Sequence, residues 1–247
     1  MEKTERPKSW PERKKEIKHK RLTPFIYVEW LCEWLSYLFG RWAFLDILGH
    51  VGRLTILVAV ISYIWGIEGR REERHYQAWQ VINDAQGKPG NLGRIKALQD
   101  LNDDRVYLTS VDISKAFLPD VDLQNAKLWD ANLSMARLDY ANLSGADLWG
   151  ANLSKAEFYI ANLSGAHIKH ANLSGVDLRG ANLSGADLDK VGGWKKIQNI
   201  TLTNIYGIKN PPNGFIQWAK DKGAVEIESY KEWQDLLKKK GYKRKMR

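Results

Sequence analysis

The stretch ANLSGADLWGANLS, residues 141–154, repeats one short phrase. Copies of ANLS begin at residues 131, 141, 151, 161, 171 and 181. Each copy contains Asn-Leu-Ser, an acceptor sequence for N-linked sugars. The same recurrence is expected if a structural unit of fixed length returns Asn, Leu and Ser to equivalent places. The spacing of the apolar residues decides between these two explanations.

A large apolar residue stands at every fifth position from Leu108 to Leu188 without exception. Two positions before each of them stands Ala or Val, from Val106 to Ala186. A period of five fits neither an α-helix, with its period of 3.6, nor a strand, with its period of 2. It fits a coil whose sides are each five residues long, with the small and the large residue both pointing inward.

The pattern, A(N/D)Lxx, resembles the pentapeptide-repeat family over residues 106–190. The resemblance implies an all-β solenoid core, a right-handed quadrilateral β-helix with four pentapeptides per coil and about four coils in all. Such a periodic structure produces Asn-Leu-Ser by itself, because polar residues suit the turns and outward positions between the core residues. We therefore interpret the sequons as structural rather than as sugar attachment sites.

Outward-facing residues twenty positions apart are expected to stack in columns, and two of the four columns contain mainly Ser. The other two contain aromatic residues, and in one of them Lys169 is placed for a cation–π contact with a Trp. Exposed apolar stripes often mark contacts with a partner. The predicted partner-binding residues are Trp129, Trp149, Lys169, Tyr140, Tyr159 and Ile160. The alternative is that these side chains only shield the backbone.

The N-terminal region contains an uncharged run from Leu54 to Ile67. Its 14 residues would rise about 21 Å as a helix, whereas a bilayer core is about 30 Å thick. The preceding segment, rich in Trp and Tyr, is typical of an amphipathic interfacial helix. We predict that residues 25–68 form a membrane helical hairpin, crossing or partly re-entering the bilayer. A single pass and a buried soluble hairpin stay open as alternatives.

The net charge of +9 is concentrated in the two tails. Residues 1–24 carry +5 and residues 191–247 carry +8, whereas the repeat carries −3. Basic tails suit nucleic acid or anionic lipid, and the adjacent apolar segment favours anionic membrane lipids as partners. Nucleic acid is disfavoured because the tail Lys and Arg residues are not interleaved with a base-stacking surface.

Both open ends of a solenoid need a cover, because they expose core and unpaired backbone. At the C-terminal end, AVEIE (residues 224–228) predicts a strand, and Ser229 with Glu232 forms a capping box that starts a helix. The predicted segments are a basic N-terminal segment (1–24), a membrane hairpin (25–68), a helical connector and N-terminal cap (69–105), the β-helix (106–190), and an α/β cap with a basic tail (191–247).

This arrangement resembles membrane-attached pentapeptide-repeat proteins of cyanobacteria. The resemblance implies a bacterial plasma membrane or a thylakoid-type membrane as the location. A hairpin would place the repeat domain on the cytoplasmic face, since Lys and Arg flank both ends of the apolar region.

No catalytic constellation is visible in the sequence. His167 and His170 lack a third metal ligand, no paired carboxylates share an expected cleft, and no cofactor motif is present. We therefore expect a non-enzyme with no metal and no cofactor.

The predicted function is that of a membrane-anchored, non-catalytic scaffold or interaction module that presents the repeat to an unidentified protein partner. Homo-oligomerisation is left open. The alternative comes from the family resemblance: some pentapeptide-repeat proteins mimic DNA and protect DNA gyrase. That role needs a strongly acidic rod, and a repeat charge of −3 disfavours it.

Overall fold

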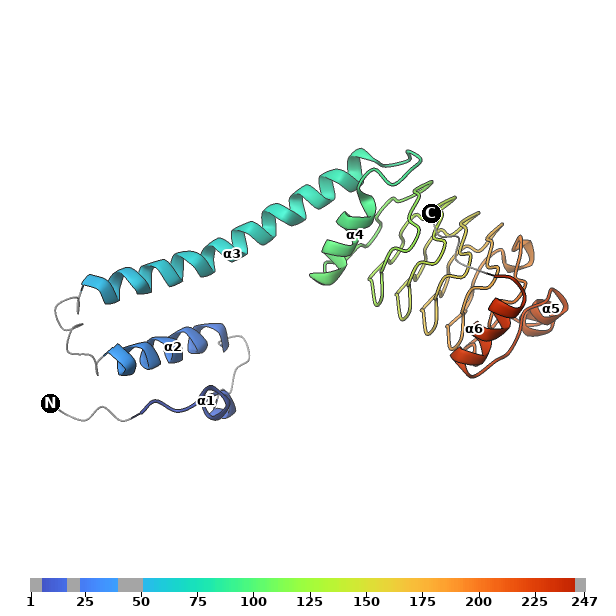
Figure 1. Cartoon of the computed structure of the whole chain (residues 1–247). Coiled ribbons are helices and arrows are strands. Elements are labelled where there is room, and N and C mark those ends of the chain that lie inside the picture. The colour runs from blue at the N-terminus through green and yellow to red at the C-terminus, as the bar shows by residue number, and fades with distance from the viewer. Residues whose placement is uncertain (1–5, 17–22, 40–50, 243–247) are drawn as a thin grey trace. The chain divides into compact units, whose positions relative to one another are not determined.

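The computed structural model describes residues 6–16, 23–39 and 51–242 (Figure 1). The turn of the expected hairpin (40–50) and the basic C-terminal end (243–247) lie outside the described residues. The chain divides into two compact units, Met1–Arg71 and Glu72–Arg247.

The first unit contains α1 (Trp10–Glu16), α2 (Thr23–Phe39) and the N-terminal part of α3 (Val51–Asp84). Ser9 precedes α1 and forms a capping box with Glu12, whose carboxylate accepts the backbone N–H of Ser9 at 2.9 Å and its hydroxyl at 2.8 Å. An ion pair of 2.6 Å between Arg13 and Glu33 joins α1 to α2.

None of the helices in the described ranges is both long enough and apolar enough to span a membrane. Helix α3 has 34 residues, but its apolar run ends at Ile67, after which the same helix continues through Arg70, Arg71 and Arg74. The membrane-spanning helices expected within residues 25–68 therefore find no support in this part of the chain.

The second unit is a stack of four-sided coils, visible in Figure 1 as parallel loops. Parallel β-bridges join residues twenty positions apart, for example Asn132, Asn152 and Asn172 in one column. The backbone N–H of Leu133 donates to the carbonyl of Asn152 at 2.9 Å, and the N–H of Asn152 donates to the carbonyl of Ala131 at 2.9 Å. The coil thus satisfies its backbone groups between neighbouring turns.

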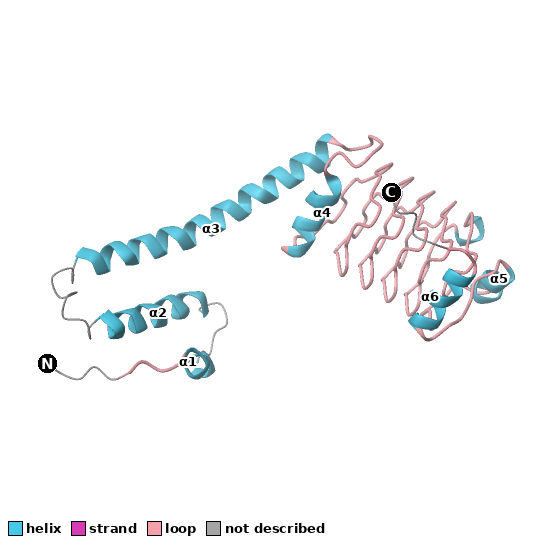
Figure 2. Ribbon diagram, viewed as in Figure 1, coloured by secondary structure: helices cyan, strands magenta, loops and turns pink. Residues whose placement is uncertain are grey.

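These bridges are single, and the described part of the second unit contains no extended strand (Figure 2). The expected all-β core is corrected in this respect: neighbouring turns of the coil are joined by isolated parallel bridges and not by strands. Each side of the coil is five residues long and ends at a corner where φ is positive, as at Met135 (φ 58) and Lys155 (φ 59). Only one residue per side pairs before the chain turns, so the ladder never extends into a strand.

The inward positions form one continuous core. Leu143 and Ala141 are fully buried, their counterparts from Leu108 to Leu188 are also buried, and Phe158 replaces Leu at one layer without becoming exposed. Burying a Leu side chain contributes roughly 1.5–3 kcal/mol. Since each layer is covered by the layers above and below it, the coils stabilise one another.

The Asn side chains of the repeated phrase form ladders along the coil. Asn182 Nδ2 donates to Asn162 Oδ1 at 3.3 Å, and Asn162 Nδ2 donates to Asn142 Oδ1 at 3.4 Å. Asn162 Oδ1 also accepts the backbone N–H of Ser164 at 3.2 Å. Asn, Leu and Ser therefore recur because the ladder, the core and the turn require them.

The N-terminal end of the coil is covered by α4 (Arg94–Asp103), whose Leu98 and Leu101 are fully buried. Arg94 is also fully buried and donates to the carbonyl oxygens of Ala85 and Lys88 at 2.9 Å each, with further bonds to Asn91 and Gly90. Burial lowers the pKa of Arg94. This buried guanidinium ties the loop before α4 to the cap.

At the other end the coil continues past residue 190. A 3₁₀ turn, η3 (Trp194–Lys196), lengthens one side, so that Asp177 pairs with Asn199 and Asp187 with Lys209. The cap then contains α5 (Phe215–Asp221) and α6 (Tyr230–Lys239). In place of the expected strand at 224–228, the structure has a single parallel bridge between Asn204 and Val225.

Candidate functional site

The first aromatic surface, which we call the tyrosine face, comprises Tyr140 and Ile160 in one column and Tyr159 in the column beside it. Tyr140 meets Tyr159 edge-on with ring centroids 5.5 Å apart, and Arg179 lies over the Tyr159 ring at 5.7 Å. The structure therefore brings these predicted residues together.

The tyrosine face is covered by the chain's own C-terminal cap. The ring of Tyr242 stacks on Tyr159 at a centroid distance of 5.6 Å. Gly180 stands at the corner one full coil after Ile160, and a Cβ atom added there would lie 3.1 Å from the Tyr242 ring and 3.3 Å from Leu237 of α6. Burial raises the pKa of Tyr159, and Tyr140 and Tyr242 act in the same direction. This face is an intramolecular packing site.

Sequence reasoning missed this cover because Leu237 and Tyr242 lie far along the chain from the residues that they touch. The available signal was the amphipathic pattern of YKEWQDLLKK, whose Trp233 and Leu237 are buried. That pattern shows that α6 must pack on something, without showing on which side of the coil it packs.

The second aromatic column, which we call the tryptophan face, comprises Trp129 and Trp149. These side chains stand on adjacent coils and are 41% and 45% exposed. The ring of His170 lies 5.5 Å from the Trp149 ring. Trp129 and Trp149 thus occupy the exposed positions that the column pattern predicts.

Lys169 has a different contact from the one expected. Its Nζ forms an ion pair with Asp187 Oδ2 at 3.1 Å, and the ring contact described for Trp149 is with His170. Burial acts to raise the pKa of Asp187, but hydrogen bonds from Asn210, Lys169 and the backbone N–H of Asp189 outweigh it and hold the pKa below the usual range. The Lys169 ammonium therefore offsets the charge of the Asp187 carboxylate beside the tryptophan face.

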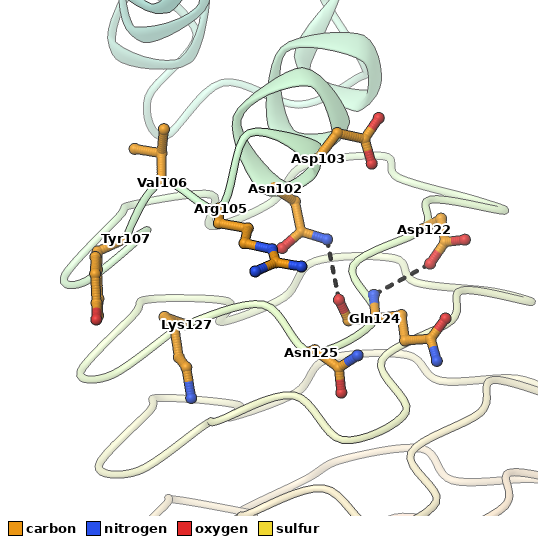
Figure 3. Close-up of a pocket in the computed structure, with 9 residues that line it drawn as sticks. All are labelled: Asn102, Asp103, Arg105, Val106, Tyr107, Asp122, Gln124, Asn125 and Lys127. Atoms are coloured by element: carbon orange, nitrogen blue, oxygen red, sulfur yellow. Dashed lines mark hydrogen bonds between the residues drawn. The ribbon is translucent and has the colours of Figure 1, made fainter. Parts of the chain in front are cut away.

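A groove of about 500 Å³ adjoins the same side of the coil, between the end of α4 and the first turns (Figure 3). Asn102 Nδ2 donates to the carbonyl of Gln124 at 3.1 Å, which fixes one wall. Lys127 lines the groove two residues before Trp129, so the groove and the tryptophan face adjoin. The lining residues are Asn102, Asp103, Arg105, Val106, Tyr107, Asp122, Gln124, Asn125 and Lys127.

The groove offers amides and charges of both signs. Arg105 and Lys127 oppose Asp103 and Asp122 in Figure 3. Such a lining can hydrogen-bond a polar main chain, but it lacks the histidine and paired carboxylates that proton transfer commonly uses.

The interior of the coil offers no comparable space. The void found among its core residues, which include Phe158 and Ile168, is about 10 Å³, the lower limit of the space that one water molecule needs. Among the residues that the structure describes, no group of three or more His, Cys, Asp and Glu side chains could hold a metal ion.

Residues 104–138, 131–167 and 156–191 match a family model described as pentapeptide repeats, in eight copies. A match to this family implies a right-handed β-helix, and the parallel bridges between successive turns fit that geometry. No curated protein matches the chain.

Several solved structures are similar to part of the chain. HetL, a pentapeptide repeat protein involved in heterocyst differentiation regulation from the cyanobacterium Nostoc, is 32% identical over 41% of this chain and 47% of its own, with a TM-score of 0.38. Rfr23 from the cyanobacterium Cyanothece is 32% identical over 42% of this chain and 63% of its own, with a TM-score of 0.22.

QnrB1, a plasmid-mediated fluoroquinolone resistance protein, is 15% identical over 56% of this chain and 84% of its own, with a TM-score of 0.23. The chain thus spans only 47% and 63% of the lengths of HetL and Rfr23.

Proposed function

Because residues 104–191 belong to the pentapeptide-repeat family, we propose that this chain is a non-catalytic interaction module whose tryptophan face binds a partner protein. The observation that carries the proposal is the contrast between the two aromatic columns. One is packed under α6 and Tyr242, whereas the other leaves Trp129 and Trp149 more than two-fifths exposed.

The exposed pair has the chemistry of a protein contact. Tryptophan is enriched among the few residues that dominate binding energy at protein interfaces. Both rings stand on a coil whose backbone is fixed by the turns above and below, so little conformational freedom is lost on binding. The adjoining groove would hydrogen-bond the partner's polar groups.

The charges around the face favour a protein over nucleic acid. Lys127 pairs with Asp147 at 3.7 Å and Lys169 pairs with Asp187 at 3.1 Å, so each of these two acidic side chains beside the face is matched by a lysine. A surface that imitated DNA would instead present unpaired acidic groups at regular spacing. The gyrase-protection alternative therefore gains no support from this side of the coil.

The second part of the proposal concerns location. We place the module at a bacterial plasma or thylakoid-type membrane, with the repeat on the cytoplasmic face and the N-terminal unit and basic tails in contact with anionic lipid. The uneven charge, +5 in residues 1–24 and +8 in residues 191–247, and the apolar segments between Phe25 and Ile67 support this location.

The test is photo-crosslinking in the cells that express the chain. A photoreactive phenylalanine analogue replaces Thr109, which stands in the same column as Trp129, in a wild-type background and in the Trp129→Ser/Trp149→Ser variant. The matched control is Ser144→Ala/Ser164→Ala on a serine column. Thermal unfolding of each purified variant checks that the coil is intact.

We expect one discrete crosslinked product that the serine control retains and the tryptophan variant loses. A crosslink to a second copy of the chain would make the chain its own partner. Equal crosslinking yields in the tryptophan variant and the control would refute the docking role of the face.

A further inference from the structure

The N-terminal unit has no described core. Every buried side chain in the described parts of the protein belongs to residue 78 or later. Phe25 is 72% exposed and Tyr27 is 43% exposed, although both belong to an apolar helix. Apolar surface of this kind is unfavourable in water and needs a cover.

An aromatic stripe runs along α2. Tyr27, Trp30, Trp34 and Tyr37 are spaced three or four residues apart, and their neighbouring ring centroids lie 5.5, 6.4 and 6.0 Å from one another. Trp10 of α1 joins the stripe at 4.6 Å from Tyr27. Tryptophan and tyrosine are the residues that concentrate where a bilayer meets water.

Basic groups border this stripe. The guanidinium of Arg6 lies over the Trp34 ring at 5.2 Å. The indole N–H groups of Trp30 and Trp34 both donate to the carbonyl of Lys8, at 2.7 and 3.1 Å, so the basic segment before α1 is held against the rings. Lys14 stands one helical turn after Trp10 on α1 and is exposed.

The acidic residues of α2 are already paired. Arg13 forms ion pairs with Glu33 at 2.6 Å and with Glu29 at 3.6 Å. One guanidinium offsets one of the two negative charges, which lessens the repulsion between α2 and an anionic surface. The sequence of residues 1–24 carries +5, which complements negative lipid headgroups.

We propose that α1 and α2 lie in the headgroup region of an anionic bilayer, with the aromatic stripe at the lipid boundary and the bordering Arg and Lys side chains on the phosphates. This attachment is peripheral, in keeping with described helices that are too short or too polar to span a membrane. It rests on the membrane location proposed above and gives that location a binding surface and a lipid class.

The test is flotation of the full-length chain with vesicles of phosphatidylcholine alone or of phosphatidylcholine mixed with phosphatidylglycerol. We expect binding to the anionic vesicles only, with release by high salt. Each Lys near a membrane contributes about 1 kcal/mol, so Lys14→Ala/Lys15→Ala should weaken binding roughly 30-fold. The charge-matched control is Lys115→Ala/Lys155→Ala at two exposed corners of the coil, outside both basic tails, which should bind more tightly than the α1 variant.

Trp129→Ser/Trp149→Ser separates this inference from the docking role, since it should lose the protein crosslink and still float with anionic vesicles. Two results would overturn the inference. One is the absence of flotation with anionic vesicles, even if the protein crosslink is retained. The other is equal binding to neutral vesicles that resists salt and needs detergent for release, which would indicate a spanning segment.

Discussion

At the scale of single residues, the repeat assigns each position a separate task. Asn162 shows this most clearly, because its amide joins the turn above, the turn below and the backbone of Ser164 at once. Leu163 beside it enters the core. A surface position such as Trp149 is not buried in the core, and its side chain stays 45% exposed beside His170.

A pH prediction belongs to Asp187. Its folded-state pKa is lowered, because hydrogen bonds from Asn210 and Lys169 outweigh burial. The charged carboxylate therefore stabilises the fold above the unfolded pKa of about 3.9, and this contribution is lost as the pH falls through the folded-state value. Asp187→Asn should therefore lower the free energy of unfolding at neutral pH. In acid, the free energies of unfolding of the variant and the wild type should lie closer together.

The measurement is the urea midpoint of both proteins at neutral pH and at about pH 3, on either side of the unfolded pKa. A difference between wild type and variant that stays constant over this range would contradict the prediction.

At the scale of elements, α6 and the residues after it decide which aromatic surface of the coil is covered. Its Leu237 and the following Tyr242 fit against Gly180, whose φ is +61. Where other turns place Tyr140 or Ile160 at this corner, Gly180 leaves room for the helix. The small corner residue and the helix that covers it therefore form one packing unit.

The element-scale prediction is that Gly180→Ala loosens α6. The new Cβ would lie 3.1–3.3 Å from Tyr242, Leu237 and Ile160, so the cap must shift. Gly165→Ala is a close control, because Gly165 has a similar φ of +64 and nothing lies within 4 Å of its added Cβ. Both variants bear the backbone strain of roughly 1–2 kcal/mol.

Limited proteolysis measures the difference: cleavage between residue 228 and the C-terminus should be faster in Gly180→Ala than in Gly165→Ala. Equal cleavage rates would mean that α6 does not depend on this contact.

At the scale of the whole second unit, stability comes from stacking. Leu163 is 1% exposed and lies between Leu143 and Leu183 in the layers above and below. Leu163→Asp would bury an unpaired charge where each neighbouring layer also depends on the site, so we expect a loss of about 4 kcal/mol or more. The control is Ser164→Asp, which places the same charge at the next residue, where the side chain points outward. It should lower the free energy of unfolding much less.

Urea unfolding followed by circular dichroism gives the free energies, and hydrogen exchange shows how many coils lose protection. Exchange confined to the turn that contains Leu163 would show that the coils unfold independently.

The sequence by itself determined the coil. The unbroken period of five from Leu108 to Leu188 predicted a pentapeptide repeat with its inward residues and outward columns, because every contact of this kind joins equivalent positions of successive repeats. For the same reason it correctly placed Trp129 and Trp149 at exposed positions. A family model of pentapeptide repeats matches residues 104–191.

Only the tertiary structure decided which aromatic column stays open. The cover on Tyr159 comes from Leu237 and Tyr242, outside the repeat, and the partner of Lys169 is Asp187 rather than a Trp ring. A local period cannot encode such contacts, since they depend on where a non-repeating helix packs and on which of several nearby charges a long side chain meets. The single bridges also arise in three dimensions, because the corners limit each side of the coil to one paired residue.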